Sequence, residues 1–304
     1  MNPDLSLNIA GITFRNPILL ASGTVGYGHE IAEWIDLNTI GGIVTKSLSL
    51  KPRKGNSPQR IVETPAGMLN AIGLANVGVD EFIKHKIPFL EKFNTNLICN
   101  IAASTVDEYV ACVKELTVIP AITAFEINVS CPNVKDGGLL FGNDLHAVAS
   151  ITEKTKAIST KPIIIKLSPN VPSISEFAAV AKREGADAVS AINTLVGSAI
   201  DIYTRKPKLQ NVTGGLSGPA IKPVAIAKVL EIRRKVAIPI IGIGGIMTWK
   251  DAAEFLIAGA SLVQLGTVNF INPKAAEEVI DGLREFCVSQ NIHQINELSG
   301  SVRL

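Results

Sequence analysis

Residues 162–168 read Pro162-Ile163-Ile164-Ile165-Lys166-Leu167-Ser168, an apolar and β-branched run that ends in polar side chains. Seven similar runs follow one another along the 304 residues, and most show no clean alternation of apolar and polar residues. Such runs are typical of parallel strands that are buried on both faces. The sequence therefore predicts eight strands, at Pro17–Ser22, Gly42–Ser47, Leu97–Ala102, Ala124–Ser130, Pro162–Ser168, Ala188–Thr194, Pro239–Gly244 and Leu262–Thr267.

Helical segments fall between these strands. Three of them begin with Ser or Thr and carry an acidic residue three positions later, which is a capping pattern for a helix start. These starts are Thr105, Ser173 and Thr248, and the second and third helices are predicted to end near Gly185 and Gly259. Strands that alternate with helices indicate an α/β fold.

Eight strands with intervening helices favour a single (β/α)8 TIM barrel domain over residues 1–304. The alternative is an open doubly wound sheet, but no Gly-x-Gly-x-x-Gly follows the first strand. Residues Leu5–Phe14 are expected to form an N-terminal hairpin that closes the barrel bottom. Two long connections, after Ser47 up to Leu97 and from Leu195 to Gly218, are expected to cover the C-terminal mouth.

Composition narrows the class of protein. Hydrophobic residues make up 47% and charged residues 18%, and the formal net charge of +2 is too balanced for a nucleic-acid surface. No apolar stretch approaches the roughly 18 residues of a membrane span, and the start does not resemble a signal peptide. The four cysteines form no CxxC pair, so we expect no metal or iron–sulfur site and a reducing, cytoplasmic setting.

Polar residues at the ends of barrel strands converge on one mouth. This predicted set contains two lysines and three asparagines but no carboxylate, which makes it poor for binding metals. It suits a planar, carbonyl-rich, anionic ligand, because asparagines can bind amide edges and lysines can stabilise negative charge. The set is Ser22, Lys46, Asn100, Asn128, Lys166, Asn193 and Thr194.

Three features of the sequence have competing interpretations. Lys46 and Lys166 could serve a ligand, act as Schiff-base nucleophiles, or simply extend their charged ends to water. The glycine-bearing loops 242–246 and 265–267 favour a phosphate site, with ligand-free tight turns as the alternative. Residues Asn70–Asn76, taken alone, are interpreted by default as a surface loop.

Cys131 lies just past a predicted strand, beside the strand-breaking Pro132 and Asn133. A thiol with an ordinary pKa of about 8.5 suits abstraction of a weakly acidic proton. It could also be a nucleophile, although no histidine neighbours it in sequence. We therefore expect a phosphate-binding barrel enzyme with a reactive thiol, and we interpret the other three cysteines as structural.

Four segments together resemble the dihydroorotate dehydrogenases of class 1, over almost the whole chain. They are Asn128–Asn133 (NVSCPN), Asn70–Leu74 (NAIGL), Ile192–Thr194 (INT) and Thr213–Pro223 (TGGLSGPAIKP). The segment Thr204–Pro207 (TRKP) and Met68–Asn70 (MLN) favour the NAD-linked class 1B catalytic subunit over the fumarate-linked class 1A homodimer.

This resemblance implies a TIM barrel that binds FMN and oxidises (S)-dihydroorotate to orotate in pyrimidine biosynthesis. It implies that Cys131 removes the C5 proton while hydride leaves C6, with Lys46 and Lys166 as further catalytic residues. The implied FMN contacts are Ser22, Lys46, Ser47, Asn100, Asn128, Lys166, Ile192, Gly218, Gly244, Gly245, Gly266 and Thr267. The implied substrate contacts are Lys46, Asn70, Ala71, Ile72, Gly73, Leu74, Asn128, Asn193 and Thr194.

The class 1B resemblance also implies a partner. In that class a second subunit carries FAD and an iron–sulfur cluster and passes electrons to NAD, in a heterotetramer of two catalytic and two electron-transfer subunits. Two alternatives remain at this point. One is a class 1A homodimer that uses fumarate, and the other is a barrel that binds flavin or phosphate without catalysis.

Overall fold

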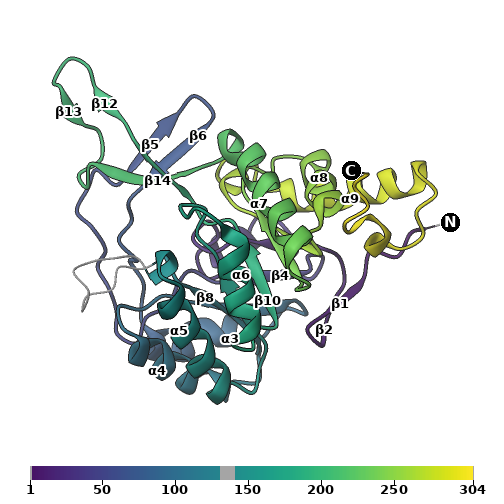
Figure 1. The fold of residues 1–304 in the computed structure, drawn as a ribbon, viewed down its shortest axis with the longest axis horizontal. Helices are drawn as coiled ribbons and strands as arrows, with labels where there is room; N and C mark the ends of the chain where they lie inside the picture. The colour runs from purple at the N-terminus through teal and green to yellow at the C-terminus, as the bar shows by residue number, and fades with distance from the viewer. Residues whose placement is uncertain (1, 131–140, 304) are drawn as a thin grey trace.

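The computed structural model describes residues 2–130 and 141–303 and contains a closed eight-stranded barrel (Figure 1). Every neighbouring pair of barrel strands is parallel, and the spatial order follows the chain. The predicted (β/α)8 barrel is therefore confirmed, and an open sheet is excluded. The strands are β3 (Ile18–Leu20), β4 (Gly42–Val44), β7 (Asn96–Ile101), β8 (Ile122–Asn128), β9 (Ile163–Lys166), β10 (Ala188–Ala191), β15 (Ile240–Ile243) and β16 (Leu262–Leu265).

Helices surround the barrel (Figure 1). The longer ones are α4 (Val106–Thr117), α5 (Leu145–Ile158), α6 (Ile174–Arg183), α7 (Lys222–Lys235), α8 (Trp249–Ala258) and α9 (Ala275–Ser289). Short helical segments lie between the first barrel strands, at α1 (His29–Ala32), α2 (Val79–Glu81), η1 (Phe82–Lys86) and α3 (Ile87–Leu90). The apolar faces of these helices pack on the outside of the strands and form one large core.

The three predicted helix starts are confirmed, but only two use the predicted cap. Thr105 accepts a hydrogen bond from the Glu108 amide at 3.2 Å, and the Asp251 carboxylate accepts one from the Thr248 amide at 2.9 Å. The hydroxyl of Ser173 instead donates to Glu231 on α7, at 3.1 Å. That carboxylate, supplied by a neighbouring helix, competes with the local cap, and a sequence pattern does not reveal it.

The N-terminal hairpin is also where the sequence predicted it. Strands β1 (Leu7–Ile9) and β2 (Ile12–Phe14) pair antiparallel. Phe14 is buried in one apolar cluster with an inward-pointing side chain from each of the eight barrel strands. The hairpin therefore closes the bottom of the barrel with an apolar plug, in which the barrel strands contribute Leu19, Val44, Ile98, Ala124, Ile164, Ala188, Ile241 and Leu262.

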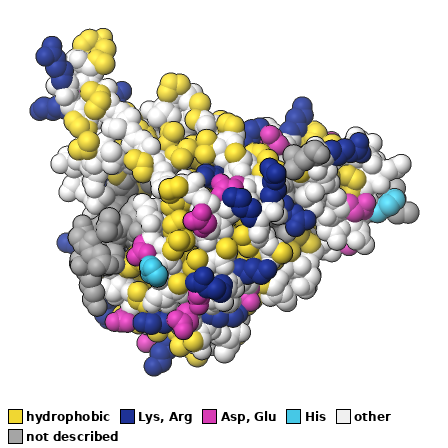
Figure 2. All heavy atoms as spheres, in the orientation of Figure 1, with side chains coloured by type: hydrophobic (Ala, Val, Ile, Leu, Met, Phe, Trp, Pro, Cys, Tyr) yellow, Lys and Arg dark blue, Asp and Glu magenta, His cyan; other side chains and the backbone are white. Residues whose placement is uncertain are grey.

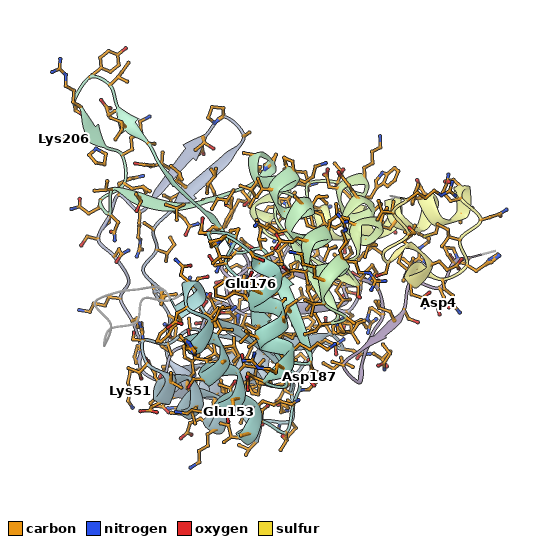
Figure 3. All side chains as sticks on the ribbon, viewed as in Figure 1. Asp4, Lys51, Glu153, Glu176, Asp187 and Lys206 are labelled. Atoms are coloured by element: carbon orange, nitrogen blue, oxygen red, sulfur yellow. The ribbon has the colours of Figure 1, made fainter. Side chains whose placement is uncertain are left out.

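The two long connections meet in one four-stranded antiparallel sheet, with the order β11-β14-β6-β5. Its strands are β5 (Ile61–Thr64), β6 (Gly67–Asn70), β11 (Leu195–Ser198) and β14 (Thr213–Ser217). A further hairpin of β12 (Ile200–Asp201) and β13 (Lys206–Pro207) projects beyond it (Figures 1 and 3). Its tip shows apolar and basic side chains (Figure 2), and Tyr203 is 90% exposed.

No helix in residues 2–130 and 141–303 is long and apolar enough to cross a membrane.

Candidate active site

A cavity of about 400 Å³ opens at the carboxyl ends of the barrel strands, beneath the four-stranded sheet. Of the predicted site residues that the structure describes, all but Asn100 line this cavity. Cys131 lies outside the described residues, directly after Ser130, which lines the cavity. The volume suits a small-molecule ligand, since such pockets usually span about 300–1,000 Å³.

The barrel interior changes from apolar to polar in one step towards the cavity. Ile98, Ala124, Ile164, Ala188 and Leu262 point into the apolar plug. Residues two positions further along a strand share its face, so the next layer upward also points inward. That layer contains Asn100, Glu126, Lys166, Ser190 and Gln264, all nearly or fully buried.

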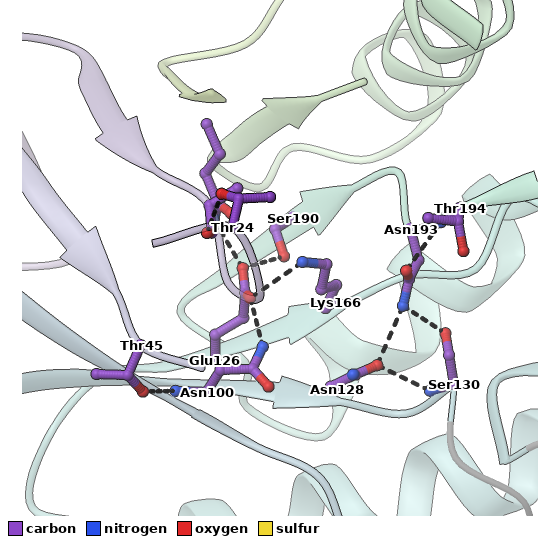
Figure 4. A network of polar contacts seen from close by, with 12 residues as sticks. Thr24, Thr45, Asn100, Glu126, Asn128, Ser130, Lys166, Ser190, Asn193 and Thr194 are labelled. Carbon is purple, nitrogen blue, oxygen red and sulfur yellow. Dashed lines mark hydrogen bonds and ion pairs between the residues drawn. The ribbon is translucent and has the colours of Figure 1, made fainter. Parts of the chain in front are cut away.

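Glu126 is the centre of this polar layer (Figure 4). Its carboxylate accepts hydrogen bonds from Asn100 Nδ2 at 2.6 Å and from Lys166 Nζ at 3.4 Å. The other oxygen accepts from Ser190 Oγ at 2.8 Å and from Gln264 Nε2 at 2.7 Å. This layer is therefore a hydrogen-bonded network that carries a buried carboxylate and an ammonium group, and its Lys166 lines the cavity.

A second polar cluster forms one wall (Figure 4). Asn193 Nδ2 donates to Asn128 Oδ1 at 3.1 Å and to Ser130 Oγ at 2.9 Å, and the Thr194 amide donates to Asn193 Oδ1 at 2.8 Å. From outside the wall, the Tyr109 hydroxyl donates to the Asn128 carbonyl oxygen at 2.6 Å. These bonds fix two predicted substrate contacts, Asn128 and Asn193, in a single orientation.

Lys46 lies two residues past the end of β4. Burial lowers the pKa of its ammonium group, Arg60 lowers it further by charge repulsion, and Glu30 opposes both effects. The side chain is only partly exposed and lines the cavity. It therefore offers an anionic ligand a partly desolvated cation, for which charge-assisted hydrogen bonds are strong.

Glycines at the ends of β15 and β16 shape another part of the cavity. Gly244 and Gly245 have φ values of 133° and 71°, and both line the cavity with Gly266 and Thr267. A Cβ at Gly266 would meet no atom closer than 3.7 Å, so it would project into open space that a ligand can occupy. Bare backbone at the ends of the seventh and eighth strands fits a phosphate group.

Asn70–Ala75 contradict the default interpretation of this segment as a surface loop. Asn70 ends β6 and donates through Nδ2 to the Gly215 carbonyl oxygen at 3.2 Å, while Ala71 to Ala75 line the cavity. Pairing with β14, about 145 residues later, holds the segment over the mouth. No local pattern reveals such a distant pairing.

The three described cysteines do not face the cavity. Cys99, Cys112 and Cys287 are all buried, and burial raises the pKa of each thiol, that of Cys112 to about 12. Their interpretation as structural residues fits this placement, because a raised pKa suppresses the reactive thiolate.

Comparison with known proteins identifies the family. The family described as dihydroorotate dehydrogenase matches residues 4–287. The chain belongs to the dihydroorotate dehydrogenase family. It is 52% identical over 302 residues to a dihydroorotate dehydrogenase B (NAD(+)), catalytic subunit, from Trichlorobacter lovleyi, and 51% identical over 302 residues to the protein of that name from Geobacter sulfurreducens. Each alignment covers 99% of both chains, and the predicted resemblance is confirmed.

One residue of this dihydroorotate dehydrogenase site escaped the sequence analysis. Glu126 stands inside an apolar run, whereas the predicted site residues stand at the ends of such runs. A signal was present, because Glu126, Ser190 and Gln264 each interrupt an apolar run, and the structure places all three two residues beyond the plug. Three such interruptions in one layer indicate a buried polar network.

Proposed function

We propose that this chain oxidises (S)-dihydroorotate to orotate in de novo pyrimidine biosynthesis, as the catalytic subunit of an NAD-linked dihydroorotate dehydrogenase. The observation that supports this proposal most strongly is the cavity, because Lys46, Lys166, the asparagine wall and the glycine loops all line it. The chain is about half identical, over nearly its whole length, to proteins named as that catalytic subunit.

The residues present fit FMN as the cofactor. The family is flavin-dependent, and hydride acceptance is the chemistry that FMN supplies when bound. Gly244, Gly245, Gly266 and Thr267 would hold its phosphate, because close backbone approach and N–H groups suit an anion. Lys166 would lie near the part of the ring that gains negative charge on reduction. The further proposed contacts are Ser22, Lys46, Ser47, Asn100, Asn128, Ile192 and Gly218.

Other residues would bind and deprotonate the substrate. Lys46 would pair with the substrate carboxylate, while Asn128, Asn193 and Thr194 would bind its amide edges, together with Asn70 and residues 71–74. Cys131 would accept the C5 proton, a role carried over from the family motif Asn128–Asn133. The hydrogen bonds around Asn193 support the proposed role of Asn128 and Asn193 in substrate binding, since they leave the amide groups of these two residues pre-oriented.

We also propose a partner. The relatives are named catalytic subunits, and a separate subunit carrying FAD and an iron–sulfur cluster would pass electrons on to NAD. The complex would contain two catalytic and two electron-transfer subunits, in the cytoplasm. The chain would fold as one barrel domain over residues 1–304.

The decisive experiment is anaerobic reduction. The purified protein should be yellow, and dihydroorotate should bleach its flavin absorbance. Cys131→Ala should keep the bound-flavin spectrum and lose nearly all of the reduction rate. Cys112→Ala, which changes a residue on α4 outside the cavity, should keep both the spectrum and the rate. A colourless protein that refuses added FMN would contradict the proposal, and fast reduction of Cys131→Ala would exclude Cys131 as the base.

The electron acceptor is tested separately. Steady-state assays with NAD and the co-purified partner should show turnover, and fumarate should not support it with the lone chain. Fumarate turnover by the lone chain would support a class 1A enzyme instead. Tight orotate binding without any turnover of dihydroorotate would support a non-catalytic barrel.

A further inference from the structure

Glu126 is fully buried within β8, and Figure 4 shows its contact with Lys166, which lines the cavity. Its four hydrogen-bond donors come from β7, β9, β10 and β16, so one carboxylate ties five of the eight barrel strands together. Burying a carboxylate is costly unless it is paired and hydrogen-bonded. A buried ion pair is often no more stabilising than apolar residues of the same volume, so stability alone does not explain it.

The partner of this carboxylate reaches the ligand site. Lys166 is 7% exposed and lines the cavity, while Glu126 lies below it and does not. The separation of 3.4 Å between Lys166 Nζ and Glu126 Oε1 is longer than the three neutral hydrogen bonds to the same carboxylate. An ammonium group has three N–H donors, so Lys166 keeps two for a ligand above it.

The neutral donors fix the carboxylate independently of the lysine. Asn100, Ser190 and Gln264 hold both oxygens at 2.6 to 2.8 Å. Among the described residues, Glu126 is the acidic group that pairs with Lys166. The arrangement therefore fixes a negative charge directly beside the Lys166 ammonium group.

We infer that Glu126 is a positioning residue, which holds Lys166 Nζ at the cavity floor and partly offsets its positive charge, and so sets how readily the bound flavin is reduced. This inference rests on the proposed function, because it assumes FMN above Lys166. A nearby cation stabilises the reduced, more negative flavin, and a carboxylate behind the cation weakens that effect. Glu126 thus keeps the flavin from becoming too easily reduced.

The test compares the ratio of reduced to oxidised FMN at anaerobic equilibrium with a redox dye, which needs no turnover. Glu126→Gln keeps the shape and removes the charge, and the ratio should rise about tenfold, as expected when one charge is removed from a low-dielectric site. Lys166→Met should lower the ratio below that of the wild type. A Glu126→Gln protein that retains FMN with an unchanged ratio would overturn the inference.

A matched control separates charge from lost packing. Thr152→Val removes a buried hydrogen bond of 2.7 Å within α5, away from the cavity. Thr152→Val should lower the thermal midpoint and leave the ratio unchanged. If Glu126 were merely structural, Glu126→Gln would behave in the same way.

Two further outcomes are distinguishable. If Glu126→Gln does not fold, Glu126→Asp takes its place, because the shorter side chain withdraws the carboxylate from Lys166, and the ratio should rise about threefold. An unchanged ratio in Glu126→Asp would overturn the inference. If the wild-type protein neither binds FMN nor is reduced by dihydroorotate, the proposed function fails and this inference with it. A reducible wild type with equal ratios in the variants defeats the inference alone.

Discussion

At the scale of single residues, the two cavity lysines have different surroundings. Lys166 has a carboxylate partner in the barrel interior, at 3.4 Å. Lys46 is instead partly buried near Arg60, and burial followed by that repulsion lowers its pKa. Lys46 therefore loses its proton at a lower pH than an ordinary lysine, whose pKa is about 10.4. An anionic ligand bound by Lys46 should therefore weaken as pH rises through this lowered pKa.

Orotate is the anionic ligand with which we expect to see this pH dependence. Its dissociation constant should rise with pH in the wild type, over a range that begins below the one in which ordinary lysines titrate, because burial lowers the pKa of Lys46. Lys46→Met should weaken orotate binding about 10- to 100-fold at neutral pH, which is the usual contribution of a charge-assisted hydrogen bond. The same variant should remove this pH dependence. Calorimetric titration measures both. Lys182→Met, on the exposed side of α6, is the control, and a wild-type constant that does not change over this range would contradict the prediction.

How much of the site was predictable also differs between residues. Lys46, Asn128 and Lys166 end apolar runs, and their convergence follows from the barrel alone. Asn100 ends such a run too, yet it is fully buried and bonds Glu126 below the cavity. The sequence locates the end of a strand, but it does not say at which height above the plug each polar side chain lies.

At the scale of elements, the N-terminal hairpin is stabilised by its contact with the barrel interior. Phe14 is 1% exposed and belongs to the same buried cluster as the inward side chains that all eight strands contribute. Removing it leaves a cavity that closed, rigid strands cannot easily fill.

Phe14→Ala should therefore lower the free energy of unfolding by about 3–5 kcal/mol. Urea unfolding measures this change, provided that both proteins reach a common unfolded baseline. Thr13→Ala alters the exposed neighbour on the same strand and should change the value by less than about 0.5 kcal/mol. Equal losses in the two variants would mean that the hairpin is only loosely attached.

The sheet over the mouth depends on a close approach between two glycines. Gly218, which follows β14, has φ 97°, and a Cβ there would lie 2.6 Å from the Cα atom of Gly67 at the start of β6. Any side chain at either position would push apart the strands that carry Asn70 and Ser217. The cavity roof is therefore sensitive to one methyl group.

Gly218→Ala should reduce stability and, if the chain binds FMN as proposed, the amount of bound FMN. Gly11→Ala is the matched control, because Gly11 also has a positive φ, 78°, but has no atom within 4 Å of the added Cβ. The strain of the positive φ, about 1–2 kcal/mol, is common to both variants, so any further loss measures the clash with Gly67. Bound flavin per chain, read from absorbance, should fall in Gly218→Ala and stay at the wild-type level in Gly11→Ala.

At the scale of the whole molecule, the ends of the chain complete the fold. The first barrel strand, β3, pairs with the last, β16, so the barrel closes only when both ends are in place. The Asp4 amide also donates to the His293 carbonyl oxygen at 2.8 Å, and the Ile295 amide donates to the Asp4 carbonyl oxygen at 2.9 Å. The eight strands and their order were predictable, because each is a local apolar run. The shared sheet of the two long connections was not, because its pairings join distant segments.

This closure predicts one cooperative unfolding unit. Trp34→Phe leaves Trp249, on α8, as the single tryptophan, so its fluorescence reports on the C-terminal half of the barrel. For the FMN-free protein in urea, the transition of this fluorescence should coincide with that of far-UV circular dichroism, the usual test of two-state behaviour. The same variant should match the wild type by circular dichroism, since Trp34 is 57% exposed. Added FMN should move both transitions together to higher urea, because binding to the folded state stabilises it by mass action. Separate transitions would show that part of the barrel folds alone, and would contradict a single domain.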